Sequence, residues 1–410
     1  MTERLYYHDS FLFEFKARVL ESVQRQGKHA IVLDRTAFYP TSGGQVHDTG
    51  KIIFDGREVI VGDVADEEDG RILHFVPEPL TAGIEVQGSV DEERRRDHIQ
   101  QHSGQHVLSA AFIELFNMPT VSFHMGEESC TIDLQSSSLS PPQVETAERR
   151  ANLIMTEDRP VTILFVPLEE ARRLGLRKLP PKQTGTLRLI DIQDYDLTAC
   201  GGTHVRSTGQ IGAILLRKIE KVKQGMRVEF VCGLRAVRTA HADFNALTNA
   251  AGLLSTHVSE LPEHINKLLE ESRSAGKREQ KLLQELAEFH AERMLASHAD
   301  ARLRVFCLVR SDRDLSFIKL LAQKLTAGTA PVIALMACTA GQTALVFARS
   351  RSAEHDMGKL MKEAMAELGG RGGGTSEMAQ GGVPSGAFDL KKTENLLQRI
   401  ASRVRDQGTA

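Results

Sequence analysis

DHIQQHSGQHVLSAAFIELF, residues 97–116, is the stretch from which the rest of the fold can be worked out. Asp97 stands three residues before a Gln, a spacing like a capping box with Asp in place of the usual Ser or Thr, so we expect a helix over this stretch. His102 and His106 are four residues apart, so both imidazoles project from one face of that helix. This geometry lets them reach one metal ion, although two unrelated histidines on a half-buried face give the same pattern.

A second pair of metal-binding side chains lies about a hundred residues later. Cys200 and His204 are also four apart, and Gly201 and Gly202 between them suit a tight loop that turns both side chains inward. A free cysteine beside a glycine turn is the plainer interpretation. Taken with the helix pair, however, one cysteine and three histidines form a plausible tetrahedral sphere for one Zn²⁺ per chain.

His98 lies one turn before His102 and is an alternative metal ligand. We rank it below the other four residues because its position near the helix start fits an exposed first turn.

The regions around this centre predict an α+β protein. Residues 1–90 alternate apolar and polar side chains in short stretches, and Asp55-Gly56 between two apolar runs is a hairpin signal, so we expect a small β-barrel. Residues 91–240 mix strands and helices and hold the proposed zinc ligands. We therefore predict an α+β zinc-binding domain here.

Two further regions follow toward the C-terminus. Residues 241–299 are predicted to form a helical linker, and within 260–296 a heptad-like seam indicates a long, coiled-coil-like helix. An intramolecular helical hairpin and a homodimer both account for that seam. Residues 300–410 alternate apolar runs with helical stretches, which predicts a small α/β domain with a Gly-rich loop over 369–386.

Bulk composition narrows the class of protein. A chain of 410 residues that is 41% hydrophobic and 26% charged, with net charge -3, has an ordinary globular composition and no overall basic field. Five cysteines without paired spacing do not indicate a disulfide framework. We find no signal peptide and no apolar run long enough for a membrane span, so we expect a cytoplasmic protein.

These motifs resemble those of the alanyl-tRNA synthetase editing domain. The resemblance rests on HSGQH at 102–106, CGGTH at 200–204 and TAFYPTSGGQ at 36–45. GRGGG at 370–374 with MAQGG at 378–382 resembles the C-terminal DHHA1-type domain of those synthetases, which DHH-type phosphoesterases share. The sequence is most similar to the freestanding alanyl-tRNA editing proteins in their long form, and we expect no aminoacylation domain.

The resemblance implies hydrolysis of the ester in tRNA(Ala) mischarged with serine, and in some members glycine. It places Thr36 against the serine hydroxyl and Gln45 against the acyl group or the attacking water, with Gly43 and Gly44 allowing close backbone approach. Zinc polarises the carbonyl, lowers the pKa of a water or positions the substrate. Four protein ligands form a closed sphere, which is typical of structural zinc, so the role of the metal stays open.

Contacts to the tRNA are expected from basic side chains, although runs of charge are more often solvated surface. The candidates are Arg94, Arg95, Arg177, Lys178, Lys182 and Arg371. A homodimer through helix 260–296 or through the C-terminal domain is a further expectation.

Two other functions remain open on the sequence alone. A non-catalytic tRNA-binding module with a structural zinc predicts tRNA binding without turnover and unfolding on metal removal. A zinc hydrolase of small esters or amides predicts activity that survives cutting near residue 258. The sequence leaves open which amino acid is removed.

Overall fold

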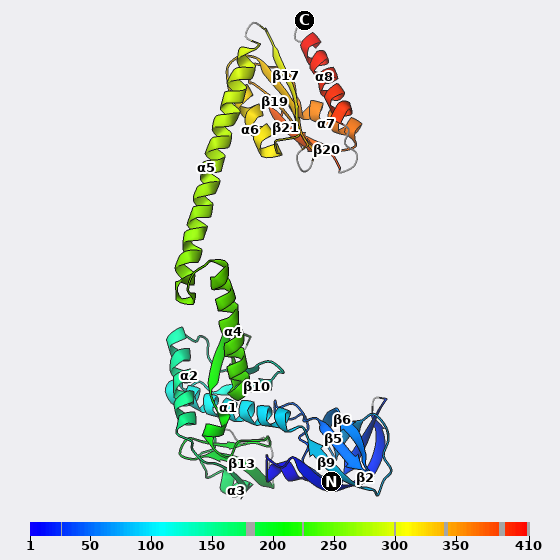
Figure 1. Cartoon of the computed structure of the whole chain (residues 1–410), viewed down its shortest axis with the longest axis vertical. Helices are drawn as coiled ribbons and strands as arrows, with labels where there is room; N and C mark the ends of the chain where they lie inside the picture. The colour runs from blue at the N-terminus through cyan, green and yellow to red at the C-terminus, as the bar shows by residue number, and fades with distance from the viewer. Residues whose placement is uncertain are drawn as a thin grey trace. The chain divides into compact units, whose positions relative to one another are not determined.

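In the computed structural model, the chain divides into two compact units, Met1–Ala250 and Ala251–Ala410 (Figure 1). The structure describes residues 1–25, 27–177, 185–223, 225–298, 301–339, 343–384 and 390–407. Both units mix helices with sheets, as an α+β protein does. No helix in these ranges is long and apolar enough to cross a membrane.

The first part of unit 1 is a seven-stranded antiparallel sheet of order β6-β5-β9-β2-β3-β8-β7. In β2, the alternation seen in the sequence buries Phe15, Ala17 and Val19. The strands are β2 (Glu14–Arg25), β3 (Lys28–Leu33), β5 (Gly50–Phe54), β6 (Arg57–Val61), β7 (Asp63–Asp66), β8 (Ile72–Val76) and β9 (Glu85–Val90). The short strands β1 (Glu3–Arg4) and β4 (Arg35–Thr36) pair in parallel beside it, and η1 (Leu5–Tyr7) follows β1.

The expected β-barrel is wrong, because this sheet is open. Its edge strands β6 and β7 do not pair with each other in the described part of the chain. The Asp55-Gly56 hairpin is confirmed, since both residues have positive φ and join β5 to β6. Alternation reveals which face a strand buries, but closure depends on whether the first and last strands meet.

The second part of unit 1 is built around α1 (Glu92–Phe116), which is buried on every side from Gln101 to Phe112. This helix begins earlier than expected, because the side chain of Asp91, not Asp97, accepts the hydrogen bond from the Arg94 amide. It ends at Asn117, which adopts the left-handed conformation. A helix buried all round can place functional side chains inside the domain.

Two antiparallel sheets and further helices surround α1 (Figure 1). The four-stranded sheet, of order β10-β11-β16-β15, contains β10 (Thr120–Met125), β11 (Cys130–Leu134), β15 (Ile214–Val222) and β16 (Gly225–Cys232). The three-stranded sheet contains β12 (Val161–Pro167), β13 (Thr186–Ile192) and β14 (Asp196–Ala199). The helices are α2 (Pro141–Thr156), α3 (Leu168–Ala171), η2 (Thr208–Ile211) and α4 (Gly233–Leu253).

Unit 2 begins at Ala251, in the last turn of α4, and continues with η3 (Val258–Glu260) and the long helix α5 (Leu261–Ala296), whose first turn contains Pro262. The long helix is therefore confirmed. Much of its seam is exposed: the side chains of Ile265, Leu282 and Phe289 are 47%, 64% and 59% exposed. Dimerisation through this seam stays a prediction.

A five-stranded sheet of order β17-β18-β19-β21-β20 follows, with β17 and β18 parallel and the other pairs antiparallel. Helix α6 and the end of α5 cover one face of this sheet, and α7 and α8 cover the other face (Figure 1). The elements are β17 (Arg304–Arg310), α6 (Leu315–Thr326), β18 (Val332–Cys338), β19 (Ala344–Arg349), α7 (Met357–Leu368), β20 (Arg371–Gly374), β21 (Met378–Gly382) and α8 (Leu390–Gln407).

The Gly-rich segment differs from the loop that we expected. Residues 371–374 and 378–382 are strands that pair with each other at the edge of the sheet. Gly372 allows this pairing, because a Cβ there would lie 2.6 Å from the Cα of Gly381.

Candidate metal centre

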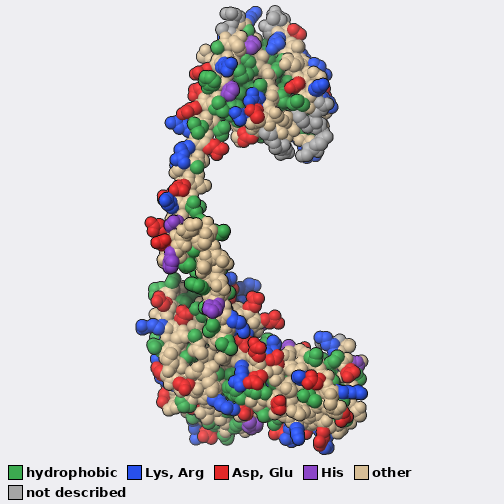
Figure 2. Space-filling model, in the orientation of Figure 1, with side chains coloured by type: hydrophobic (Ala, Val, Ile, Leu, Met, Phe, Trp, Pro, Cys, Tyr) green, Lys and Arg blue, Asp and Glu red, His purple; other side chains and the backbone are tan. Residues whose placement is uncertain are grey.

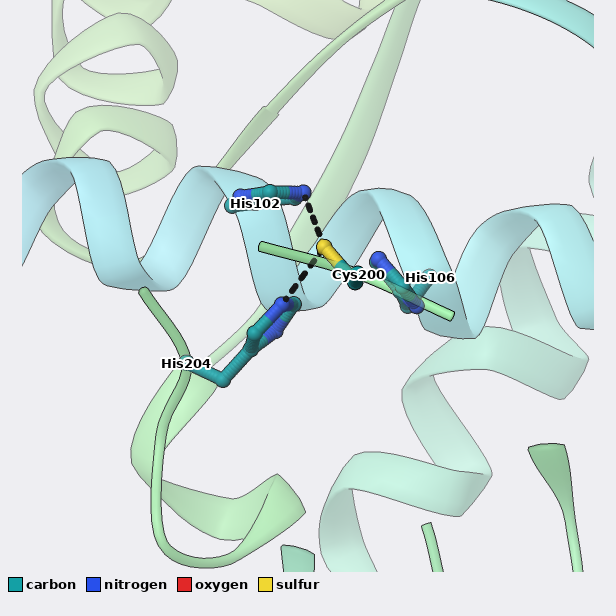
Figure 3. Close-up of side chains that lie close together, drawn as sticks. All are labelled: His102, His106, Cys200 and His204. Atoms are coloured by element: carbon teal, nitrogen blue, oxygen red, sulfur yellow. Dashed lines mark hydrogen bonds between the residues drawn. The ribbon is translucent and has the colours of Figure 1, made fainter. Parts of the chain in front are cut away.

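The four side chains that the sequence singled out come together in the structure. One ligand atom from each of His102, His106, Cys200 and His204 lies within 4.8 Å of the others (Figure 3). The Nε2 atoms of His102 and His204 lie 3.5 and 3.2 Å from the Cys200 Sγ. Nitrogen and sulfur donors at such separations fit one tetrahedral zinc ion. His98 is not part of this group.

The local sequence explains how two distant segments meet here. The i, i+4 spacing on α1 aligns His102 and His106, and the loop after β14 carries Cys200 and His204. A Cβ on Gly202 would lie 2.1 Å from the His102 ring, and one on Gly44 would lie 2.4 Å from the Phe123 carbonyl oxygen. Glycine is therefore required at 202 for the loop after β14 to approach α1, and at 44 for the 36–45 segment to approach β10.

Two of the three histidines have a polar partner within hydrogen-bond distance of the second ring nitrogen, Nδ1. The Gln45 Oε1 lies 2.7 Å from the His102 Nδ1, and the Ser103 Oγ lies 3.3 Å from the His204 Nδ1. The nearest acceptor to the His106 Nδ1 is a carboxylate oxygen of Asp196 at 3.5 Å, which is long for a hydrogen bond. Such partners orient the rings and leave Nε2 for a metal. Sequence reasoning had not assigned Ser103 or Asp196 a role.

The loop that carries Cys200 is held from behind by Arg188, which the sequence analysis had not singled out. The Arg188 Nη1 donates to the carbonyl oxygens of Cys200 at 2.7 Å and Gly202 at 3.0 Å, and Nε donates to the Tyr7 carbonyl at 2.9 Å. The side chain is buried, and its guanidinium lies over the Tyr7 ring. No local spacing points to this residue, because its contacts join three separate segments.

The protonation states fit metal binding. Burial alone would raise the pKa of the Cys200 thiol, but the neighbouring His102 and His204 imidazoles bring that pKa well below its usual value. Burial lowers the pKa of His204 well below its usual value. For His106, Asp196 and Cys200 outweigh burial and raise the pKa. The Cys200 thiolate and the neutral His204 imidazole are the donor forms that zinc requires, whereas the raised pKa of His106 favours a ring that has to release its proton on binding.

A cavity of about 550 Å³ opens onto the cluster. Most of the lining residues come from α1, from β10 and the turn before it, and from β14 and the loop after it, and none of the lining side chains is acidic. They comprise Gly43, His102, Gln105, His106, Ile113, Pro119, Thr120, Val121, Ser122, Phe123, Gln135, Arg177, Thr198, Ala199, Cys200 and Gly201. A cavity of this size beside potential metal ligands suits a small acyl group.

The two residues assigned to the acyl group by resemblance do not line this cavity. The Thr36 side chain is fully buried, and its hydroxyl lies 2.8 Å from the Nε2 of His74, whose pKa burial lowers to about 4. Gln45 is also fully buried, and its Nε2 donates to the Thr203 hydroxyl at 2.8 Å. Both amide atoms of Gln45 therefore hold the metal loop and its ligand His102 in place.

The basic residues predicted to contact tRNA have different surroundings. Arg95 has no exposed surface and pairs with Asp48, so its assignment to tRNA was wrong. Arg94 is half-buried and donates to the His47 carbonyl, whereas Arg177 lines the cavity and donates to the His106 carbonyl. Arg371 is exposed, and Lys178 and Lys182 lie outside the described residues. Figure 2 shows acidic and basic side chains mixed over the face that it draws.

Comparison with known proteins places these features in a family. Over 408 residues, the chain is 32% identical to the alanyl-tRNA editing protein AlaX-L of Pyrococcus horikoshii, covering 97% of this chain and 100% of that protein. The chain belongs to the alanyl-tRNA editing protein family. Three family models match segments of it: tRNA synthetases class II (A) at residues 3–94, the threonyl and alanyl tRNA synthetase second additional domain at 187–228, and the DHHA1 domain at 313–406.

The chain is also similar to larger proteins. The alanine–tRNA ligase of Pyrococcus abyssi is 31% identical over 97% of this chain, and that of Korarchaeum cryptofilum is 31% identical over 95%. The chain spans 43% and 44% of those ligases. The solved C-Ala domain of Aquifex aeolicus alanyl-tRNA synthetase is 22% identical over 24% of this chain and 90% of that domain, with a TM-score of 0.21, too low to support a structural argument.

Proposed function

We propose that this chain hydrolyses the ester bond of mischarged tRNA(Ala), with serine as the main amino acid removed and glycine as a second, and that it does not aminoacylate. The observation that carries the proposal is the cluster of three histidines and one cysteine at the floor of a cavity. Family membership supports the substrate class, because the Pyrococcus horikoshii relative is named as an alanyl-tRNA editing protein.

We propose one zinc ion per chain, held by His102, His106, Cys200 and His204. When bound, the metal supplies a positive charge that can polarise the ester carbonyl or lower the pKa of a water. The donor set supports zinc, because thiolate and imidazole together favour it over magnesium or calcium.

Side chains around the ligands orient the histidine rings, fix the metal loop and keep water from the acyl group. Gln45 and Ser103 orient two of the histidine rings, and Arg188 fixes the loop that carries Cys200. The apolar side chains of Ile113, Val121 and Phe123 on the wall limit how much water surrounds a bound acyl group.

The tRNA contacts belong to the proposal as well. At the cavity Arg177 is close enough to meet the terminal phosphate or ribose of a bound tRNA, and Arg94 and the exposed Arg371 are candidates for phosphates elsewhere. The paired strands that carry Arg371 belong to unit 2, which we propose binds the body of the tRNA.

A second candidate function is a non-catalytic tRNA-binding module. It is favoured by one observation, namely that four protein ligands already fill a tetrahedral sphere, the arrangement typical of structural zinc. It predicts tight binding of tRNA(Ala) with no faster loss of serine than in buffer.

The test is deacylation of Ser-tRNA(Ala) and Ala-tRNA(Ala) by the full chain and by Cys200→Ala. We expect the intact chain to release serine faster than alanine. Cys200→Ala should lose this activity by at least roughly 100-fold, because removing a ligand weakens a metal site more than removing its hydrogen-bond partners does. Cys307→Ala, at a half-buried cysteine in unit 2, is the matched control. Equal serine release by the intact chain and Cys200→Ala would contradict the proposal.

A further inference from the structure

Metal ligands apart, one buried side chain among the described residues of the cavity wall has an amide oxygen that no donor reaches. Hydroxyls on its wall already donate within the protein, Thr120 to Ser109, Ser122 to Asp133 and Thr198 to Asp196, and have only their weaker hydroxyl lone pairs left as acceptors. Since the amide of Gln45 and the hydroxyl of Thr36 are engaged elsewhere, neither is free to meet an acyl group.

Gln105 is that side chain. It lies on α1 between the two helix ligands, lines the cavity and is only 6% exposed. Its Nε2 donates to the Ser109 Oγ at 2.8 Å, and the Thr120 Oγ1 donates to the same oxygen at 2.7 Å. No donor among the described residues reaches the Gln105 Oε1. One end of the amide is thus fixed, and the other is available to a bound molecule.

We propose that Gln105 is the specificity-determining residue, and that its Oε1 accepts a hydrogen bond from the side-chain hydroxyl of the esterified serine. This inference rests on the proposed function. Oε1 is an acceptor only, and a serine hydroxyl supplies the donor that it lacks. Because α1 carries Gln105 next to His106, the contact forms beside the metal cluster.

The contact accounts for discrimination against alanine, which is smaller than serine and enters any cavity that admits serine. With serine bound, the Oε1 of this largely buried side chain is satisfied. With alanine bound, a methyl group takes the place of the hydroxyl and leaves that oxygen unpaired, which opposes binding. Size alone cannot produce this order of preference.

The experiment compares binding of two stable analogues, in which serine or alanine is joined by an amide to 3′-amino-3′-deoxyadenosine. Dissociation constants are measured for the intact chain and for Gln105→Leu. We expect the intact chain to bind the seryl analogue about 10- to 100-fold more tightly than the alanyl analogue, and Gln105→Leu to bind the two equally. Gln105→Glu keeps an acceptor and should retain the seryl preference.

Gln135→Leu is the matched control, since it removes an exposed amide from the outer wall of the same cavity and should leave the preference unchanged. If thermal unfolding shows that Gln105→Leu does not fold, Gln105→Asn takes its place, because the shorter amide cannot reach the hydroxyl.

Three results would overturn the assignment. They are an intact chain without seryl preference, a Gln105→Leu variant that keeps the preference, and an equal loss of affinity for both analogues, which would assign Gln105 to the ammonium group that serine and alanine share. An intact chain that fails to deacylate Ser-tRNA(Ala) would instead reject the proposed function, so the two failures are distinguishable.

Discussion

Helix α1 and the segment from Thr36 to Gln45 both bring polar side chains toward the metal cluster, but they use them differently. On α1, His102, Gln105 and His106 line the cavity. In the 36–45 segment, the hydroxyl and amide groups of Thr36 and Gln45 point into protein and are fully buried. The polar side chains of α1 face the cavity, whereas those of Thr36 and Gln45 contact protein groups, although Gly43 of the same segment also lines the cavity.

The two glutamines make this difference concrete. Gln45 uses both ends of its amide, one on His102 and Thr203 and the other on the Thr203 hydroxyl. Gln105 uses one end on Ser109 and keeps the other. Residues of the same type therefore serve different purposes, and what distinguishes them is whether protein atoms satisfy the whole amide. Substitution of Gln45 should therefore act through the metal and affect every substrate alike.

Within the 36–45 segment, the largest loss of zinc affinity is expected for Gln45→Leu. Without the amide, the His102 Nδ1 and the Thr203 amide lose their acceptor, so the ring is no longer oriented. We expect the zinc dissociation constant to rise about 10- to 100-fold, as happens when outer partners of ligating histidines are removed. Competition with a chromophoric chelator measures it.

Gln87→Leu, which removes an amide that bonds Glu14 on an exposed face, is the control for that measurement. Deacylation of seryl and glycyl tRNA should fall in parallel in Gln45→Leu. If only the serine rate fell while zinc stayed bound, Gln45 would belong with Gln105 as a substrate contact.

The ligands themselves could be found from sequence because each pair has a local signal. On a helix, a spacing of four residues places two side chains on the same face. In the loop, two glycines between a Cys and a His allow a tight turn that brings both side chains to the same side. The outer partners have no such signal. Arg188 and Asp196 lie on strands far from α1 in the sequence, and only the assembled fold brings them to the ligands.

Other errors trace to long-range contacts or to a misplaced helix start. The barrel prediction failed because strand alternation says nothing of how edge strands meet. The error at Arg95 followed from the expected helix start at Asp97, which left residues 94–96 outside the helix. Because α1 begins at Glu92, successive arginines are turned by about 100°, and Arg95 points inward, where Asp48 pairs with it.

A smaller effect is expected for Arg188→Lys, which tests support of the loop rather than of a ligand ring. Lysine keeps the charge but lacks the fork that reaches Cys200, Gly202 and Tyr7 together. We expect zinc affinity to fall roughly 3- to 10-fold, corresponding to about one lost hydrogen bond.

The cobalt-substituted protein distinguishes this role from a general loss of stability, because the thiolate-to-cobalt absorption band reports the position of the Cys200 Sγ. That band should shift in Arg188→Lys. Arg349→Lys is the control, since Arg349 also donates to several carbonyls, but in unit 2. An unchanged band with lower stability in both variants would assign Arg188 a purely structural role.

The smallest effect on activity is expected for Thr36→Val. This substitution distinguishes a Thr36 that contacts the substrate from a Thr36 that only holds His74 and the Phe38 amide. Valine matches threonine in shape but leaves the His74 Nε2 and the Phe38 amide without the hydroxyl that they contact. We expect the free energy of unfolding to fall by about 1–3 kcal/mol, the cost of leaving a buried polar group unsatisfied, as measured by urea denaturation.

Serine release should stay within about twofold of the intact chain, because Thr36 does not line the cavity. A selective loss of serine release at unchanged stability would show that the 36–45 segment contacts the substrate after all.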